Sequence, residues 1–267
     1  MAVVIDGPTA AWRYVRPLAQ ACAGPHVTVA GNRVRIPGPL PIRLSVVAGN
    51  IRMHRLLRLA IPAAGTVVDV GANVGYNTVF ASRCVGPAGR VVALEPAADN
   101  VRVLRANIAA NALDNVEVHE VAAGRGREVR DLFLRGETSG VNSLFEESVY
   151  ATVTAVAKVT VAPLDEVVDG PADVVKIDVE GAELDVLGGM TRMLRRPAVQ
   201  LIVEWHPRLQ EAAGYTADAL PRFLLDRGFT LHAASHTRVS RLHAVDIDSL
   251  SARLRRRGRP VELVAVR

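Results

Sequence analysis

The chain has 267 residues, of which 49% are hydrophobic and 22% are charged, values that fit one α/β domain with additions. The formal net charge is +5, but aromatic residues make up only 4%, which disfavours a stacking surface for single-stranded nucleic acid. The sequence shows neither a leader-like segment nor an apolar run long enough to span a membrane, so we predict a cytoplasmic protein without membrane partners.

The first 64 residues are predicted to form an N-terminal extension of short helices and a hairpin. One short helix is expected near residues 10–22. Residues 26–36 alternate in polarity around a Gly-Asn pair, which predicts the hairpin. Apolar residues at helical spacing then predict a helix over residues 50–60, packed on the main domain.

From residue 65 to residue 267, apolar runs alternate with helix-like segments, which predicts a doubly wound, mostly parallel seven-stranded sheet. The expected strands lie near residues 67–70, 91–95, 116–121, 173–178, 199–204, 229–233 and 261–266. The expected helices lie near residues 75–84, 99–110, 182–195 and 217–227. Between residues 124 and 165 this rhythm breaks, which indicates a β-rich insertion of the kind that shapes substrate pockets.

The segment VVDVGANVGYNT, residues 67–78, carries the first candidate site. A buried strand runs into Asp69, a tight turn contains Gly71 and Gly75, and a helix follows. The glycines let the backbone pass close to a ligand, and the turn amides can bind its polar groups. The spacing D-x-G-x-x-x-G differs from the G-x-G-x-x-G of dinucleotide-binding folds, which argues against NAD.

Acidic residues end two further apolar runs. Glu95 follows the apolar run in VVALEP, where Pro96 stops the strand, and an acid at this position is placed to accept hydrogen bonds from both ribose hydroxyls of an adenosine. Its alternative is a surface glutamate before a turn. Asp178 and Glu180 follow VVKI in the segment VKIDVEGAELDVL.

The three segments VDVGANVGYNT, VVALEP and VKIDVEGAELDVL resemble the FkbM family of methyltransferases over about residues 65–207. The resemblance implies a class I methyltransferase (Rossmann-like) fold and S-adenosylmethionine as cofactor. Most members are O-methyltransferases of sugars, polyketides and other secondary metabolites, which implies a small-molecule hydroxyl acceptor. The implied cofactor-binding residues are Asp69, Gly71, Asn73, Gly75, Tyr76, Asn77, Glu95, Pro96, Ala122 and Ala123.

Methyl transfer from a sulfonium is an in-line displacement, and an alcohol acceptor must also lose its proton to a base or a metal. We predict Asp178, Glu204 and His206 as catalytic residues, since they follow the fourth and fifth strands. His206 would act as the base, oriented by Glu204. The alternatives are helix capping by the acids and a structural or exposed histidine.

A divalent metal held by Asp178 and Glu204 is an alternative to base catalysis, but the residues do not favour it. Asn142 and Ser143 in the insertion, together with Glu180, are predicted to bind the acceptor. The alternative for the two insertion residues is an ordinary turn.

Two other functions remain open, RNA ribose methylation and cofactor binding without turnover. The N/D-P-P-Y/F segment of base N-methyltransferases is absent after the fourth strand, where this chain has Asp-Val-Glu-Gly. The basic run over residues 253–259 is interpreted as a solvated surface, which does not favour nucleic acid as a partner. Cys22 and Cys84 lack the spacing of a disulfide framework or a metal site.

Overall fold

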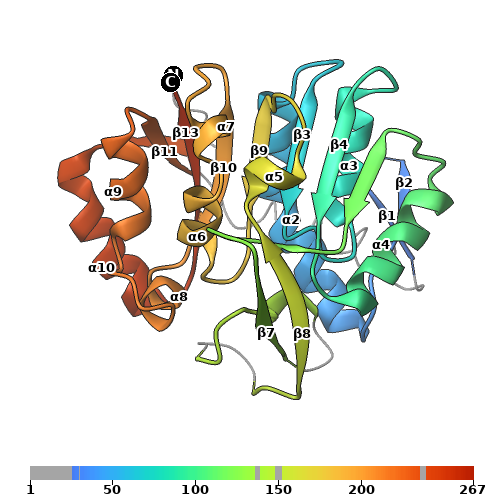
Figure 1. The fold of residues 1–267 in the computed structure, drawn as a ribbon, viewed down its shortest axis with the longest axis horizontal. Coiled ribbons are helices and arrows are strands. Elements are labelled where there is room, and N and C mark those ends of the chain that lie inside the picture. The colour runs from blue at the N-terminus through green and yellow to red at the C-terminus, as the bar shows by residue number, and fades with distance from the viewer. Residues whose placement is uncertain (1–25, 30, 136–138, 148–151, 235–238) are drawn as a thin grey trace, which may run out of the picture.

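An eight-stranded sheet forms the centre of the computed structural model, which describes residues 26–29, 31–135, 139–147, 152–234 and 239–267 (Figure 1). Its strands are β3 (Thr66–Val70), β4 (Arg90–Leu94), β5 (Val116–His119), β9 (Val174–Ile177), β10 (Gln200–Trp205), β11 (Thr230–Ala234), β12 (Val239–Leu242) and β13 (Val261–Val266). Their order is β12-β11-β13-β10-β9-β3-β4-β5. Strands β10, β9, β3, β4 and β5 pair in parallel, whereas β13 is antiparallel to β10 and β11, and β12 to β11.

All seven predicted strands are present, but the predicted number was wrong because β12 adds an eighth. This strand is the short segment VSRL at the edge of the sheet. Ser240 and Arg241 are exposed and Leu242 is buried, so the segment has no apolar run and little alternation to reveal it. It forms by pairing with β11.

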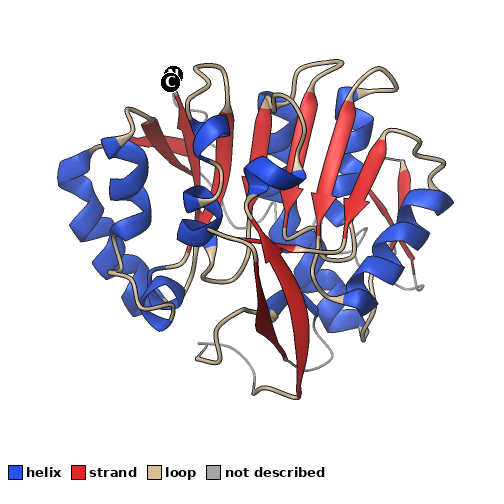
Figure 2. Cartoon of the chain, viewed as in Figure 1, coloured by secondary structure: helices blue, strands red, loops and turns tan. Residues whose placement is uncertain are grey.

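Helices cover both faces of the sheet (Figure 2). One face carries α2 (Leu40–Ala60), α3 (Tyr76–Val85) and α4 (Ala98–Ala110), and the other carries α5 (Leu164–Val167), α6 (Glu183–Gly188), α7 (Thr191–Leu194), α9 (Ala219–Asp226) and α10 (Ile247–Arg257). Neighbouring strand residues point to opposite faces. Val67 packs with the α2 and α3 side chains, and Val68 packs with those of α6 and α9. The doubly wound architecture is therefore confirmed.

Several helices differ from their predicted bounds. The helix predicted over residues 50–60 begins at Leu40, with a proline in its first turn. The helix predicted over residues 182–195 is interrupted between α6 and α7, where a side chain on Gly189 would lie 1.9 Å from the carbonyl oxygen of Gly124. The short helices α5 and α8 (Pro207–Ala212), and the longer α10, were not predicted.

The hairpin predicted in the N-terminal region is confirmed as β1 (His26–Val29) and β2 (Asn32–Arg35), which pair antiparallel. Asn107 of α4 and Asn111, the residue that caps this helix, hold it against the domain. Asn107 accepts a hydrogen bond from the Arg35 backbone at 2.7 Å, and Asn111 accepts one from the Arg33 backbone at 2.9 Å. The helix predicted near residues 10–22 lies outside the described residues.

The insertion contributes a second sheet at the carboxyl edge of the first. Its strands are β6 (Ala122–Ala123), β7 (Glu128–Leu134) and β8 (Ala155–Ala162), in the order β6-β8-β7. Strands β7 and β8 are antiparallel, as predicted for this region. The described residues also include the 3-10 helices η2 (Ser139–Val141) and η3 (Ala244–Asp246). Figure 1 shows β7 and β8 below the tips of the parallel strands. None of the helices in the described part of the chain has the length and apolarity needed to cross a membrane.

Candidate active site

A cavity lies at the carboxyl edge of the large sheet, between the strand tips and the insertion. Its volume is about 580 Å³, including the open mouth. The lining consists of Val70, Gly71, Asn73, Leu94, Glu95, Pro96, Val121, Ala122, Ala123, Leu132, Gly140, Asn142, Ser143, Leu144, Asp178, Val179, Glu180 and Ala182. Predicted cofactor residues and predicted acceptor residues therefore share one cavity.

The turn after β3 approaches the turn after β9 closely. Gly71 has a φ of +77°, and a Cβ atom at this position would lie 2.0 Å from the backbone oxygen of Asp178. Both the conformation and the space therefore require glycine. The backbone amides of Gly71 and Ala72 donate to the carbonyl of Leu94 at 3.0 Å, so the turn is fixed to the end of β4.

Glu95, at the end of β4, already accepts three hydrogen bonds from the protein. Oε2 accepts from the Asn73 amide at 2.9 Å, and Oε1 accepts from the Ala97 amide and the Asn100 side chain, each at 3.0 Å. A carboxylate offers about four acceptor positions, so about one remains, on Oε2. The expectation that Glu95 accepts from both ribose hydroxyls therefore exceeds its remaining capacity. Burial raises the pKa of this carboxyl, and the three donors oppose that rise.

Asp69 does not line the cavity, although it was predicted to contact the cofactor. Its Oδ2 accepts from the Thr78 hydroxyl at 2.6 Å, and its Oδ1 lies 3.2 Å from the ammonium group of Lys176. Lys176 also donates to the carbonyl of Gly71 at 2.9 Å. Asp69 therefore stabilises the glycine turn indirectly, because it holds the Lys176 side chain that binds the Gly71 carbonyl.

Gly75, Tyr76 and Asn77 also lie outside the cavity lining, at the start of α3. Gly75 has a φ of +86°, and a Cβ atom there would lie 2.4 Å from the side chain of Leu104. The Tyr76 ring stacks on the ring of His54 in α2, with centroids 4.8 Å apart, and Asn77 hydrogen-bonds the same histidine. These residues fix the helix that follows the turn.

Ala122 and Ala123 form β6 and line the cavity together with Pro96. Asn142 and Ser143 line the side formed by the insertion. Asn142 accepts from the Arg135 backbone at 3.0 Å, and the Ser143 hydroxyl donates to the carbonyl of Glu180 at 2.7 Å. Ser143 therefore joins the insertion to the turn after β9.

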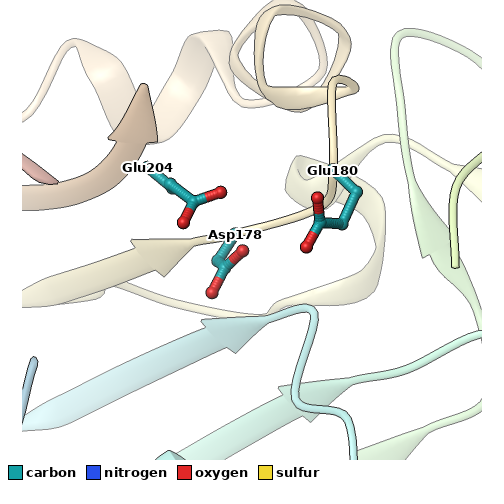
Figure 3. Close-up of side chains that lie close together, drawn as sticks. All are labelled: Asp178, Glu180 and Glu204. Atoms are coloured by element: carbon teal, nitrogen blue, oxygen red, sulfur yellow. The ribbon is translucent and has the colours of Figure 1, made fainter. Parts of the chain in front are cut away.

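Three carboxylates meet beside the cavity (Figure 3). One oxygen from each of Asp178, Glu180 and Glu204 lies within 4.8 Å of the others, and we call this group the carboxylate cluster. Asp178 and Glu180 line the cavity, whereas Glu204 lies behind them, at the end of β10. Burial and the neighbouring acids raise the pKa values of Glu180 and Glu204 well above the usual range of glutamates.

His206 faces away from the cavity lining. Its Nδ1 accepts from the Leu209 amide at 3.4 Å, which caps the N-terminus of α8, and its ring also bonds the backbone of Gly258. Burial lowers the pKa of the imidazole. Pro207 begins the new helix directly after the strand and so turns the ring toward α8 and α10. The predicted pairing of His206 with the cluster as a base does not agree with this geometry.

Two buried charged residues that sequence reasoning did not select hold the strand tips. Lys176 is the first, and it stood out only as a lysine within an apolar strand. Glu183 is the second. It accepts from the amides of Val179 at 3.2 Å and Gly181 at 3.1 Å, and from the Gln210 side chain at 2.6 Å. Burial raises the pKa of Glu183 to about 7.

A mostly parallel sheet with this strand order, a glycine turn after β3 and an acid at the tip of β4 defines a class I methyltransferase fold. The family model described as methyltransferase FkbM domain matches residues 69–231. The chain belongs to the FkbM methyltransferase family, which confirms the resemblance.

One curated relative is the AMB antimetabolite synthetase AmbE of Pseudomonas aeruginosa, which is 32% identical in an alignment of 208 residues that covers 64% of this chain. The chain spans about a tenth of the length of that relative, since the match covers 10% of it. Among solved structures, the methyltransferase FkbM from Methylobacillus flagellatus is 16% identical, with a TM-score of 0.47 over 96% of this chain and 60% of that one. Cofactor-bound Rv0187 from MTB is 18% identical, with a TM-score of 0.48 over 98% of each chain.

Proposed function

We propose that the enzyme transfers the methyl group of S-adenosylmethionine to a hydroxyl of a small molecule, namely a sugar or another secondary metabolite. The observation that carries this proposal is the pairing of two different surfaces in one cavity. The cofactor wall consists of Gly71, Asn73, Glu95, Pro96, Ala122 and Ala123. The acceptor wall consists of Asn142, Ser143, Asp178 and Glu180.

The cofactor wall supports binding of the adenosine part of S-adenosylmethionine. The remaining acceptor position of Glu95 suits one ribose hydroxyl, and the small side chains of Ala122 and Ala123 leave room for the adenine ring. The turn at Gly71 lies against the turn that carries Asp178, so the cofactor wall and the acceptor wall adjoin. In-line transfer requires the methyl group of the bound cofactor to face the acceptor wall.

The acceptor wall supports an oxygen nucleophile. Asp178 and Glu180 can accept hydrogen bonds from an alcohol, and Asn142 and Ser143 add neutral polar groups that would orient a hydroxylated substrate. The name of the Pseudomonas relative, an antimetabolite synthetase, supports a secondary metabolite as acceptor.

Mass spectrometry with trideuteromethyl-labelled cofactor tests this proposal directly. The purified protein is incubated with a panel of sugars and macrolide-type alcohols, and one labelled methyl group is expected on a hydroxyl oxygen. The matched control is the deoxy analogue of each positive acceptor, which should stay unmodified. A label found on nitrogen or carbon of the acceptor would contradict O-methylation.

A further inference from the structure

The carboxylate cluster has too little positive charge around it. Lys176 is shared, since its ammonium group lies 3.2 Å from Asp69 and 3.7 Å from Asp178. Two more acids face the cluster, and each is already bonded. Glu183 binds backbone amides, and Glu262, opposite Glu204 in the sheet, pairs with Arg52 of α2.

Arg135, a second cation near Glu180, is directed elsewhere. Its guanidinium donates to the backbone carbonyls of Phe145 at 2.7 Å and Glu146 at 2.6 Å. Three partly exposed carboxylates this close together repel one another unless they take up protons or hold a cation between them. A positive ligand is one of the two ways to relieve this repulsion.

Glu180 supplies an independent sign of such a ligand. Its Oε2 is inaccessible to solvent and has no hydrogen-bond partner among the described residues. Figure 3 shows this carboxylate directed toward Asp178 and Glu204. A buried charged oxygen without a partner is costly, and a coordinated cation would satisfy it.

The spacing of the cluster suits a cation that prefers oxygen. Ligand oxygens on opposite sides of an ion bound at 2.3–2.6 Å lie about 4.6–5.2 Å apart, and neighbouring ligands lie closer. The three carboxylates offer oxygens that all lie within 4.8 Å of one another. We propose that Asp178, Glu180 and Glu204 bind one hard divalent cation of the Mg²⁺, Mn²⁺ or Ca²⁺ type. Water or the acceptor would complete its coordination.

The catalytic use of this ion rests on the proposed function. Asp178 and Glu180 also line the cavity, so a cation held by them would face a bound hydroxyl. Such an ion lowers the pKa of a coordinated alcohol and would replace the distant His206 in removing its proton. Binding of the ion itself does not depend on the identity of the acceptor.

Titration with Mn²⁺ followed by electron paramagnetic resonance tests the site without any acceptor. The full chain with S-adenosylhomocysteine is expected to bind one Mn²⁺, and competition with Mg²⁺ and Ca²⁺ then shows which ion is preferred. Glu204→Gln should weaken Mn²⁺ binding by at least the roughly tenfold-to-hundredfold loss seen when outer-sphere partners of metals are removed. Glu117→Gln is the matched control, because Glu117 pairs with Arg90 on β4 and should leave Mn²⁺ binding unchanged.

Binding of S-adenosylhomocysteine, measured by calorimetry, shows that each variant is folded. If Glu204→Gln does not fold, Glu180→Gln serves as the test in its place. Wild-type protein that binds the nucleoside but no Mn²⁺, Mg²⁺ or Ca²⁺ would overturn the cation site and leave methyl transfer intact. Unchanged Mn²⁺ affinity in both variants would overturn it as well. A bound ion without methylation of any alcohol would instead contradict the proposed function alone.

Discussion

Glu95 and Glu180 both follow strands of the central sheet and line the same cavity, but they are bonded very differently. Glu95 accepts three hydrogen bonds from the protein, which fix it before any ligand arrives. Glu180 has a positive φ of 54° and a carboxylate oxygen that finds no hydrogen-bond partner in the described part of the chain. The cofactor wall is therefore preorganised by the protein itself, whereas the acceptor wall leaves charge to be satisfied by what binds there.

The largest effect should follow a change that tests whether the acceptor wall performs chemistry. Asp178→Asn removes one charge and keeps the shape of the side chain. Turnover should fall by about two to four orders of magnitude, while affinity for S-adenosylhomocysteine is retained. Steady-state kinetics and calorimetry measure the two quantities. Asp131→Asn, which removes a carboxylate bound to Lys158 on the insertion, is the control. Near-full turnover of Asp178→Asn would show that Asp178 is a structural residue. The acceptor wall would then have no catalytic role through this side chain.

Gly71→Ala tests how rigidly the cofactor wall is held. The left-handed conformation costs a non-glycine residue about 1–2 kcal/mol, and the contact with the Asp178 carbonyl adds overpacking of about 1–3 kcal/mol. The free energy of unfolding in urea should therefore fall by about 2–5 kcal/mol. Gly126→Ala, at an exposed glycine with nothing within 4 Å, should change little. Equal losses of unfolding free energy in both variants would show that the turn at Gly71 rearranges to accommodate a side chain.

His54 packs against α3, the helix that follows the glycine turn, and should make the stability of the protein depend on pH. Burial lowers the pKa of His54 to about 4, against hydrogen bonds with Tyr76 and Asn77, and Arg58 lowers it further. The unfolded chain therefore takes up this proton before the folded one, and stability is lost as pH falls from about 6.5 to about 4. The loss from this group is about 3 kcal/mol.

Urea unfolding of wild type and His54→Phe across that pH range measures the contribution of His54 by difference, which cancels the other titrating groups. The phenyl ring keeps the stacking on Phe80, whose centroid lies 3.9 Å from that of His54. His243→Phe, at an exposed histidine, is the control. Identical pH dependence of wild type and His54→Phe would refute the assignment.

The smallest effect concerns the contact between Glu95 and the cofactor. Glu95→Ala removes a charged acceptor, so affinity for S-adenosylhomocysteine should fall roughly tenfold to a hundredfold. Asn100→Ala removes one of the donors that hold Glu95 without touching the cavity lining, so its loss should be smaller. Calorimetry that finds unchanged affinity for Glu95→Ala would remove Glu95 from the cofactor wall.

The sequence predicted the features that depend on local chemistry. Buried strands appear as apolar runs, and the glycines and acids after them mark the strand tips, which is why the large sheet and most of the cavity lining were foreseen. The edge strand β12 and the amphipathic α10 were missed. In α10, the apolar residues Ile247, Leu250 and Leu254 are buried, but the arginines at the end of the helix hide this apolar face in the sequence.

The predictions for the site that were wrong depend on where side chains point in the folded protein, and the spacing of residues along the chain does not give that information. His206 follows a strand tip as expected, but Pro207 begins a helix there and directs the ring toward Gly258. Asp69 has the spacing of a cofactor ligand, but Lys176 and Thr78 occupy its oxygens. The third member of the cluster, Glu180, was assigned only to acceptor binding, because its convergence with Glu204 requires two separate turns to meet.

The position of β13 sets the order in which the molecule can be assembled. This strand comes last among those of the sheet but lies between β10 and β11. Until it is in place, both neighbours expose unpaired edges that can recruit other chains, and pairing over such long separations is slow. The same strand brings Glu262 opposite Glu204 and within reach of Arg52. A folding intermediate that lacks β13 would therefore contain every residue of the cofactor wall beside an unfinished acid cluster, and aggregation from its open strands would compete with the final closure of the sheet.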